Sequence, residues 1–224
     1  MNYYFNFDVV LNNIGNMLRG LGFGLFIAVI SLFFGIILGI IAAFAAVSSN
    51  HVLNKFSTVY RVLFRNTPLL VLIYIVYFGL PDVGIKMEKT VSFIFTLSLY
   101  AGAYMTEVFR AGLQAIPKGI IEAGQAIGLT RFQISWEIQL PIMFRYVLPS
   151  MSNYLISLFK DTSLAASITV CELTYYARKL NVETFRVLEA WLTAAFLYIL
   201  TCYLMAYLLR KLERKLSIGV ERDR

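Results

Sequence analysis

Five long apolar stretches, separated by polar connectors, dominate the pattern of residues along this chain. They cover residues 20–47, 56–80, 90–108, 146–170 and 190–209. Each is close to the roughly 20 residues that a helix needs to cross a lipid bilayer. The first and fifth stretches contain no charged residue at all. The pattern therefore predicts an all-α integral membrane protein with about five transmembrane helices.

Composition agrees with this class and excludes two others. Hydrophobic residues make up 59% of the 224 residues and charged residues only 15%, whereas soluble domains have about 45–50% and 25%. A soluble fold of this length could not bury so much apolar surface. Disordered chains are polar and poor in aromatic residues, but this chain has 18 Phe and 14 Tyr. We expect a single transmembrane domain over residues 1–224.

The distribution of Lys and Arg along the chain, whose net charge is +7, predicts the orientation in the membrane. Most Lys and Arg outside the apolar stretches fall on the side of the C-terminal tail, and cytoplasmic loops carry the excess of these residues. We expect the N-terminus outside and the C-terminus in the cytoplasm. The basic tail from Arg210 onward would then lie against anionic lipid headgroups.

The mixed segment between the third and fourth stretches predicts a first short helix, at about residues 118–127. Pro117 suits the start of a helix, and Gly128 suits the left-handed residue that ends one. The surface of this helix is made of small residues with one acidic neighbour, Glu122. The small residues are Gly119, Ala123, Gly124 and Ala126. Small side chains let another backbone approach closely, so we expect a docking element; a loop capped only for its own stability is the alternative.

A second short helix should follow directly. Thr130 and Gln133 have the spacing of a capping box, and the helix should end before Pro141. Two helices around a Gly turn also resemble a DNA-reading helix-turn-helix. Residues 118–141 carry only two basic residues, however, and contact with DNA phosphates needs several. We expect no nucleic acid as a partner.

Several motifs in this segment and around it carry a family resemblance. Glu122-Ala123-Gly124, then Gly128, then Ile138-Gln139-Leu140-Pro141 resemble the EAA signature of membrane subunits of ATP-binding-cassette (ABC) importers. The third Ala of the signature is Gly124 here. Residues 64–70, 104–124 and 159–164 resemble segments of permeases for polar amino acids. The resemblance extends over nearly the whole chain.

Membership of that family implies the permease fold of type I ABC importers, with a cytoplasmic coupling loop at about residues 113–141. The implied coupling residues are Glu122, Ala123, Gly124, Gly128, Leu140 and Pro141. The implied partners are a dimer of ATPase subunits, a second permease subunit (a copy or a paralogue) and an extracytoplasmic solute-binding protein. The implied mechanism is alternating access in a bacterial cytoplasmic membrane.

The chain itself should not be an enzyme. It contains no G-x-x-x-x-G-K-[ST] motif, the loop that cradles ATP phosphates. We therefore expect ATP and Mg²⁺ on the partner ATPase and no cofactor on this chain. A lone His51 and the distant Cys171 and Cys202 offer no metal-ligand cluster.

Polar side chains inside membrane spans are costly and often mark a solute pathway. The candidates are Asn66, Thr67, Tyr100, Tyr104, Tyr154, Asp161, Thr162 and Ser163. Asp161 would hold an α-ammonium group, or would instead be a structural partner of a nearby cation. Thr67, Ser163 or backbone N–H groups would hold an α-carboxylate. Glu107 and Arg110 share a helix face and should form a structural pair.

The resemblance also bears on the substrate. Permeases for basic amino acids in this family tend to carry Glu where this chain has Tyr154, so we expect a neutral or acidic amino acid, or a similar solute. The alternative class is a stand-alone secondary transporter or channel for a small polar solute. No inverted repeat with two broken helices, typical of many secondary transporters, is visible. A membrane enzyme is a third alternative, but no nucleophile–base arrangement supports it.

Overall fold

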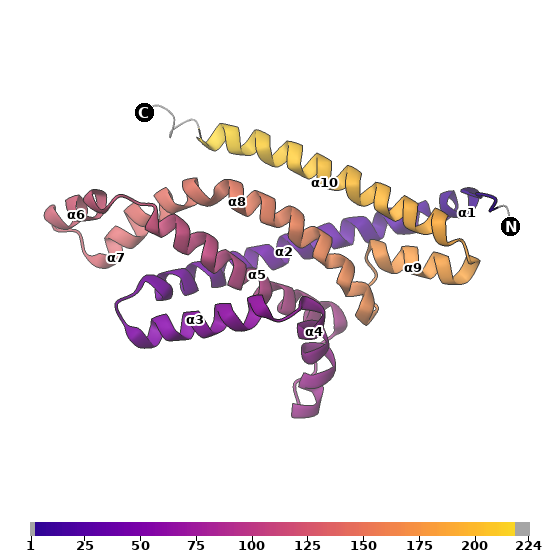
Figure 1. The fold of residues 1–224 in the computed structure, drawn as a ribbon, viewed down its shortest axis with the longest axis horizontal. Coiled ribbons are helices and arrows are strands. Elements are labelled where there is room, and N and C mark those ends of the chain that lie inside the picture. The colour runs from indigo at the N-terminus through magenta and orange to yellow at the C-terminus, as the bar shows by residue number, and fades with distance from the viewer. Residues whose placement is uncertain (1–2, 218–224) are drawn as a thin grey trace.

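The computed structural model describes residues 3–217, which form helices and short connections without any strand (Figure 1). The α-helices are α1 (Asp8–Leu11), α2 (Ile14–Val47), α3 (His51–Asn66), α4 (Leu69–Tyr74), α5 (Lys89–Gln114), α6 (Lys118–Ala126), α7 (Arg131–Gln133), α8 (Leu140–Asp161), α9 (Leu173–Thr184) and α10 (Val187–Ser217). Two π-helical segments, η1 (Ile75–Gly79) and η3 (Ile134–Gln139), and two 3₁₀ segments, η2 (Leu80–Val83) and η4 (Thr162–Ile168), complete the chain.

The core of the bundle is the contact between α2 and α5. Small residues allow the two helices to approach closely: a Cβ atom added at Gly35 would lie 2.7 Å from Cβ of Ala101, and one at Gly39 would lie 2.6 Å from Cβ of Met105. Close packing through small residues is typical of membrane helices. Around this contact, most of the large buried side chains of the same core come from α5 and α8. They include Phe93, Leu97, Phe109, Met143 and Leu158.

By length and apolar composition, three described helices can cross a membrane: α2, α5 and α10. The pair of α3 and the segment from α4 to η2 would make a fourth if it is one bent span. The expected span at residues 146–170 corresponds mainly to α8, which carries Arg145, Lys160 and Asp161 and is not among these. The all-α membrane class is confirmed, with three to four clear spans on these criteria where the sequence predicts about five.

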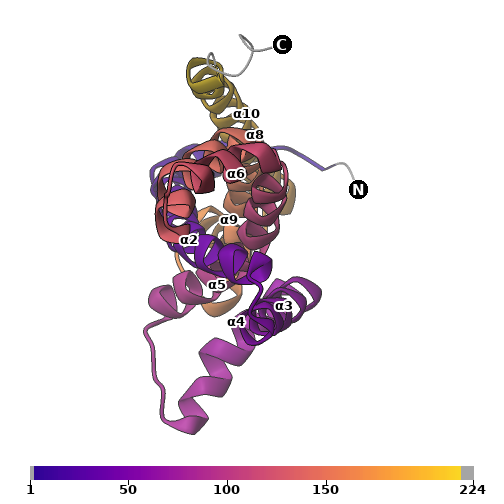
Figure 2. The same ribbon diagram turned by 90° about the vertical axis from the view of Figure 1, so that its left-hand side faces the viewer.

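The expected continuous helix over residues 56–80 is wrong. Helix α3 ends at Asn66, and the next helical segment is turned by 103°. Pro68 explains the break, because its ring disfavours a helical conformation at the preceding residue. Thr67 is extended accordingly, with φ −97° and ψ 129°. As a result, α4 and the chain after it project away from the bundle (Figure 2).

Two other expectations require correction after α5. The helix that begins at Thr130 does not end before Pro141, because α7, η3 and α8 follow one another without a break. The π-helical hydrogen bonds of η3 shift the register just before Pro141, whose missing N–H would interrupt a regular α-helix. The connector expected after residue 170 contains α9, whose N-terminus is capped by the Glu172 carboxylate.

The bundle has two distinct ends. Figure 1 shows α1 and α9 at one end and α6 and α7 at the other. Helix α10 begins at the α9 end and runs toward the α6 end, extending as one helix to Ser217. The C-terminal tail thus continues the fifth predicted helix, as expected, and residues 218–224 lie outside the described part of the chain. The polar loop α6–α7 and the helix α9 are therefore separated by the full length of the bundle.

Candidate coupling loop and transport pathway

The turn after α6 has the geometry that its sequence predicts. Gly128 is left-handed, with φ +84°. Its N–H donates to the carbonyl of Gln125 at 3.0 Å, and the N–H of Leu129 donates to the carbonyl of Gly124 at 3.1 Å. These two bonds form a Schellman motif, which satisfies carbonyl groups left open at the end of a helix. The turn is therefore locally determined.

The capping box that starts α7 is also present. The Gln133 N–H donates to Oγ1 of Thr130 at 3.3 Å, and the Thr130 N–H donates to Oε1 of Gln133 at 2.9 Å. Both bonds satisfy groups that the helix itself leaves unpaired. Two capped helix ends flanking residues 127–130 hold the bend between α6 and α7 in one shape.

The predicted coupling residues divide into an inner and an outer set. Gly124 is buried, and a Cβ atom added to it would lie 3.0 Å from Cδ1 of Ile138, so α6 packs on η3 there. Leu140 packs against the main core. The other four, Glu122, Ala123, Gly128 and Pro141, are exposed. The loop thus presents Glu122 and Ala123 outward on a backbone that is fixed from behind.

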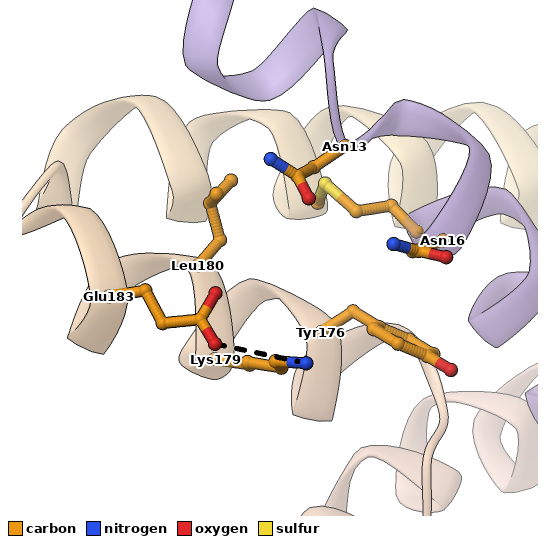
Figure 3. Close-up of a pocket in the computed structure, with 7 residues that line it drawn as sticks. Asn13, Asn16, Tyr176, Lys179, Leu180 and Glu183 are labelled. Carbon is orange, nitrogen blue, oxygen red and sulfur yellow. Dashed lines mark ion pairs between the residues drawn. The ribbon is translucent and has the colours of Figure 1, made fainter.

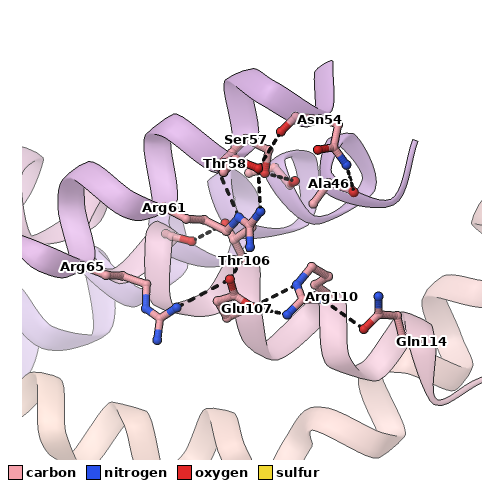
Figure 4. A network of polar contacts seen from close by, with 12 residues as sticks. Ala46, Asn54, Ser57, Thr58, Arg61, Arg65, Thr106, Glu107, Arg110 and Gln114 are labelled. Carbon is pink, nitrogen blue, oxygen red and sulfur yellow. Dashed lines mark hydrogen bonds and ion pairs between the residues drawn. The ribbon is translucent and has the colours of Figure 1, made fainter. Parts of the chain in front are cut away.

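A polar cluster on α3 and α5 centres on Glu107 (Figure 4). The carboxylate pairs with Arg61, lies 2.7 Å from the Arg110 guanidinium and 3.5 Å from that of Arg65. Arg110 also donates to Oε1 of Gln114 at 3.0 Å. The expected Glu107–Arg110 pair is confirmed. The two further arginines around Glu107 were not predicted, because they come from another helix, α3.

Three of the predicted pathway residues lie together where α5 meets α8. The Tyr100 and Tyr104 rings are 4.9 Å apart, and their hydroxyl groups are 3.2 Å apart. The Tyr154 ring stacks on Tyr104 at 5.4 Å. The Tyr154 hydroxyl is buried without a hydrogen-bond partner among the described residues. The guanidinium of Arg65 lies 5.2 Å from the centre of the Tyr104 ring, within the range of a cation–π contact.

The remaining pathway candidates lie at two helix ends. Asn66 is the last residue of α3 and is exposed, while the hydroxyl of Thr67 donates to the carbonyl of Leu63 at 2.8 Å. Asp161 ends α8 and is partly buried.

Thr162 and Ser163 follow in η4 and differ in their surroundings. Ser163 is partly buried. Thr162 is fully buried: its hydroxyl donates to the carbonyl of Phe159 at 2.6 Å and faces Gly24 of α2. In this conformation Thr162 is therefore turned toward α2 and is closed to a solute.

The opposite end of the bundle contains buried acidic residues that the sequence did not single out. Glu172 accepts hydrogen bonds from the N–H groups of Thr174 and Tyr175 at 2.8 and 2.7 Å, and from the Tyr198 hydroxyl at 2.9 Å. Burial raises the pKa of the Glu172 carboxyl to about 7. Its place before a helix suggests a cap, but its burial depends on α10 and is not visible in the sequence.

The same end holds a small cleft between the start of α2 and α9 (Figure 3). Its volume is ≈ 40 Å³, and Asn13, Asn16, Tyr176, Lys179 and Glu183 contribute to its walls. Lys179 and Glu183 form an exposed ion pair at 3.8 Å. Nearby, Glu189 holds the N-terminal segment by accepting hydrogen bonds from the Tyr3 hydroxyl and the Asn6 N–H.

Apolar helices, a broken helix beside polar side chains and an exposed capped loop at one end define a membrane transport subunit. Comparison with known families agrees. Residues 35–218 match the model of the family described as binding-protein-dependent transport system inner membrane component. The chain belongs to this family. It is therefore a permease component of an inner-membrane transport system that depends on a solute-binding protein and on an ATPase.

Individual relatives extend over nearly the whole chain. It is 36% identical over 192 residues to the L-cystine transport system permease protein TcyB of Bacillus subtilis, and the match covers 85% of this chain and 82% of that protein. It is 32% identical over 216 residues to the glutamine transport system permease protein GlnP of Escherichia coli, and the match covers 96% of this chain and 99% of that protein.

Solved structures show the same fold. A chain of an amino acid ABC transporter crystallised with histidines superposes with a TM-score of 0.86 at 25% identity, over 95% of this chain and 100% of that one. A chain of the MetNI methionine ABC transporter in an inward-facing conformation superposes with a TM-score of 0.77 at 20% identity, over 91% and 97%. The permease fold of type I ABC importers is thereby confirmed.

Proposed function

We propose that this chain is the permease subunit of an ABC importer that moves a neutral or acidic amino acid into the cytoplasm by alternating access. The relatives named for L-cystine and glutamine transport support the substrate class. The single observation that carries the coupling mechanism is the α6–α7 loop, which presents Glu122 and Ala123 on a backbone fixed by the Schellman turn and the capping box.

Glu122 and Ala123 contact the ATPase in this proposal, and Gly128 sets the turn that presents them. The exposure of Glu122 and Ala123 and the burial of Gly124 behind them suit such a contact. Leu140 and Pro141 connect the loop to α8. ATP and Mg²⁺ bind to the partner ATPase, and this chain holds no cofactor of its own. The loop belongs to one transmembrane domain over residues 1–224.

The orientation follows from the same contact. A loop that meets a cytoplasmic ATPase places the α6–α7 end of the bundle in the cytoplasm. The C-terminal end of α10 is then also cytoplasmic, and α1 and α9 lie outside (Figure 1). A second permease subunit, either a copy or a paralogue, completes the pathway, and the solute-binding protein delivers the solute to the α9 end.

The solute passes along the cluster of Tyr100, Tyr104 and Tyr154. Asp161 binds the α-ammonium group at this site, while Thr67 and Ser163, with Asn66 nearby, bind the α-carboxylate. The break at Thr67 supports this position, since non-helical backbone at membrane depth is tolerated where it lines a cavity. Thr162 joins the pathway only in another conformation, because its hydroxyl faces α2 in this one.

The charge around the cluster favours a neutral or acidic solute over a basic one. Three arginines surround the single carboxylate of Glu107, and one of them, Arg65, also contacts Tyr104. This excess of positive charge repels a cationic side chain. Tyr154, whose hydroxyl has no partner among the described residues, offers a hydrogen bond in place of a carboxylate.

Reconstitution with the ATPase and the binding protein in lipid nanodiscs tests the proposal. We expect ATP turnover to be stimulated by a neutral or acidic amino acid. Asp161→Asn should remove that stimulation, while Lys160→Gln, an exposed neighbour on the same helix, should retain it. Stimulation by arginine or lysine alone would overturn the substrate class. A normal response of Asp161→Asn would remove its ligand role.

A further inference from the structure

An open apolar groove runs between α2 and the segment that joins the coupling loop to α8. Its volume is ≈ 400 Å³. Ile40, Ile41 and Phe44 form the α2 wall, and Phe132 and Trp136 are part of the opposite wall. Arg131 also lines the groove, as the first residue of α7. The groove is separate from the tyrosine cluster, which lies between α5 and α8.

The position of the groove along α2 places it at a membrane surface. Ile40, Ile41 and Phe44 lie near the end of the charge-free part of this spanning helix, which stops at Val47 and is followed by the polar residues 48–50. The α2 wall is therefore at the level of the lipid chains. An apolar wall at this level matches a lipid chain better than the surface of a water-soluble subunit, so the groove favours a lipid as its occupant.

The aromatic side chains mark the same boundary. Phe132 is 74% exposed and Trp136 63% exposed. Their rings are stacked, with centres 6.4 Å apart. Two large exposed aromatic rings on a helix are costly in water, whereas Trp is enriched at the level of lipid headgroups. The pair thus lies where one end of a lipid chain meets the headgroup.

Arg131 supplies the charge that matches a lipid headgroup. Its side chain is exposed and forms no ion pair with any residue between 3 and 217. We infer that the groove binds an anionic phospholipid, with one acyl chain against Ile40, Ile41 and Phe44 and the phosphate on Arg131. Apolar walls, an aromatic pair and one uncompensated cation match the three parts of such a molecule.

The lipid would also brace the coupling loop. The groove wall from Arg131 to Leu140 is continuous with the capped turn at Thr130 on one side and with α8 on the other. A lipid seated there fills the space between this wall and α2. The inference does not depend on the identity of the solute, and lipid binding is measurable without the ATPase or the binding protein.

Tryptophan fluorescence gives a direct test, because the chain has only two tryptophans, Trp136 and Trp191. The variant Trp191→Phe leaves Trp136 as the sole emitter. The full chain is placed in nanodiscs that contain phosphatidylglycerol and phosphatidylcholine. In one sample only the phosphatidylglycerol is brominated, and in the other only the phosphatidylcholine. We expect the quenching of Trp136 to show about fivefold tighter binding of the anionic lipid than of the neutral one. One contact between an arginine and an anionic lipid contributes about 1 kcal/mol, which corresponds to this ratio. Equal quenching by the two lipids would overturn the proposal.

Matched variants identify the headgroup contact. Arg131→Gln should abolish the preference and Arg131→Lys should keep most of it. Arg145→Gln, which removes an exposed cation of α8 that does not line the groove, should leave it unchanged. The variant Trp136→Phe reports from Trp191 instead and should show no preference. A preference that survives Arg131→Gln would contradict the assigned phosphate contact.

A protein occupant is the outcome to distinguish. The permease is labelled with 5-hydroxytryptophan, so that its emission is excited apart from that of the ATPase, and quenching is measured before and after the ATPase is added. Retained quenching supports a lipid in the assembled transporter. Loss of quenching on assembly would show that the groove belongs to a protein interface and would overturn the proposal.

Discussion

Arg65 and Tyr104 connect the end of α3 to the tyrosine cluster of the candidate pathway. The Arg65 guanidinium lies 5.2 Å from the centre of the Tyr104 ring, and one of its nitrogen atoms is 3.5 Å from Glu107. The same side chain therefore belongs to both the ion cluster and the aromatic cluster. Arg65 lies just before the break at Thr67, so it links the last turn of α3 to Tyr104.

The ion cluster should contribute measurably to stability. Glu107→Gln leaves three arginines without their carboxylate, and hydrogen bonds to charged groups contribute about 1.5–3 kcal/mol each. We expect a loss of roughly 2 kcal/mol, measured as a lower melting temperature in nanodiscs. The control is Glu183→Gln in the exposed pair with Lys179, which should change stability by less than about 1 kcal/mol. Equal effects of the two substitutions would contradict the assigned role of the cluster.

Substitutions at two glycines distinguish the effect of backbone strain from a loss of coupling to the ATPase. Gly128 and Gly84 both have positive φ, at +84° and +89°, and open space around the Cβ position. Replacement of either by Val should cost about 1–2 kcal/mol, because a left-handed conformation is unfavourable for a side chain. Only Gly128→Val should also impair ATPase assembly and solute-stimulated ATP turnover. Unaltered assembly and turnover in Gly128→Val would remove the coupling role of the turn.

The contact between α2 and α5 should not tolerate larger residues. Gly39→Val places its side chain against Cβ of Met105, where the first added carbon would already lie 2.6 Å away. Overpacking of this kind costs about 1–3 kcal/mol. Gly22→Val on the same helix has no neighbour within 4 Å and is the control. Thermal unfolding in nanodiscs should show a clear loss for Gly39→Val and little change for Gly22→Val.

Glu172 should make stability depend on pH. Burial raises the pKa of its carboxyl to about 7, above its value of about 4.3 in an unfolded chain. The folded state therefore binds the proton more tightly. This contribution is complete below about pH 4 and is lost as pH rises through 7, with a total of up to about 4 kcal/mol.

Melting temperatures of the wild type and of Glu172→Gln, compared from pH 5 to 8, test this sign. We expect the wild type to lose stability relative to Glu172→Gln as pH rises across this range. Glu172 lies at the start of α9, outside the helices that qualify as spans, so buffer reaches this end of the bundle. A parallel pH dependence in the two proteins would show that another group is responsible.

Local signals in the sequence predicted the turn at Gly128 and the capping box at Thr130 correctly. Gly128, Thr130 and Gln133 determine their own backbone through bonds to residues within five positions of themselves. The same is true of the Glu107–Arg110 pair, which lies on one turn of α5. Features of this kind need no knowledge of the tertiary fold.

Other features depend on competition between signals or on distant contacts. The apolar run over residues 56–80 outweighed Pro68 in the prediction, although the proline ends the helix in the structure. Pro141, in contrast, does not end its helix, because the π-helical hydrogen bonds of η3 shift the register just before the proline, which has no N–H to donate. The stacking of Tyr154 on Tyr104 and the bond from Tyr198 to Glu172 join residues that are far apart in sequence, and no local pattern marks them.

The unbroken succession of α7, η3 and α8 has a mechanical consequence. A displacement of the turn at Gly128 would be carried along this helical segment toward Tyr154 and Asp161, and Pro149 inside α8 is a point where the segment can bend. The π-helical turn before Pro141 is a second such point, because its hydrogen-bond register differs from that of the α-helices on either side. A change of that register by one residue would rotate every side chain of α8 relative to the α6–α7 loop, so η3 would set the angle between the loop and the tyrosine cluster.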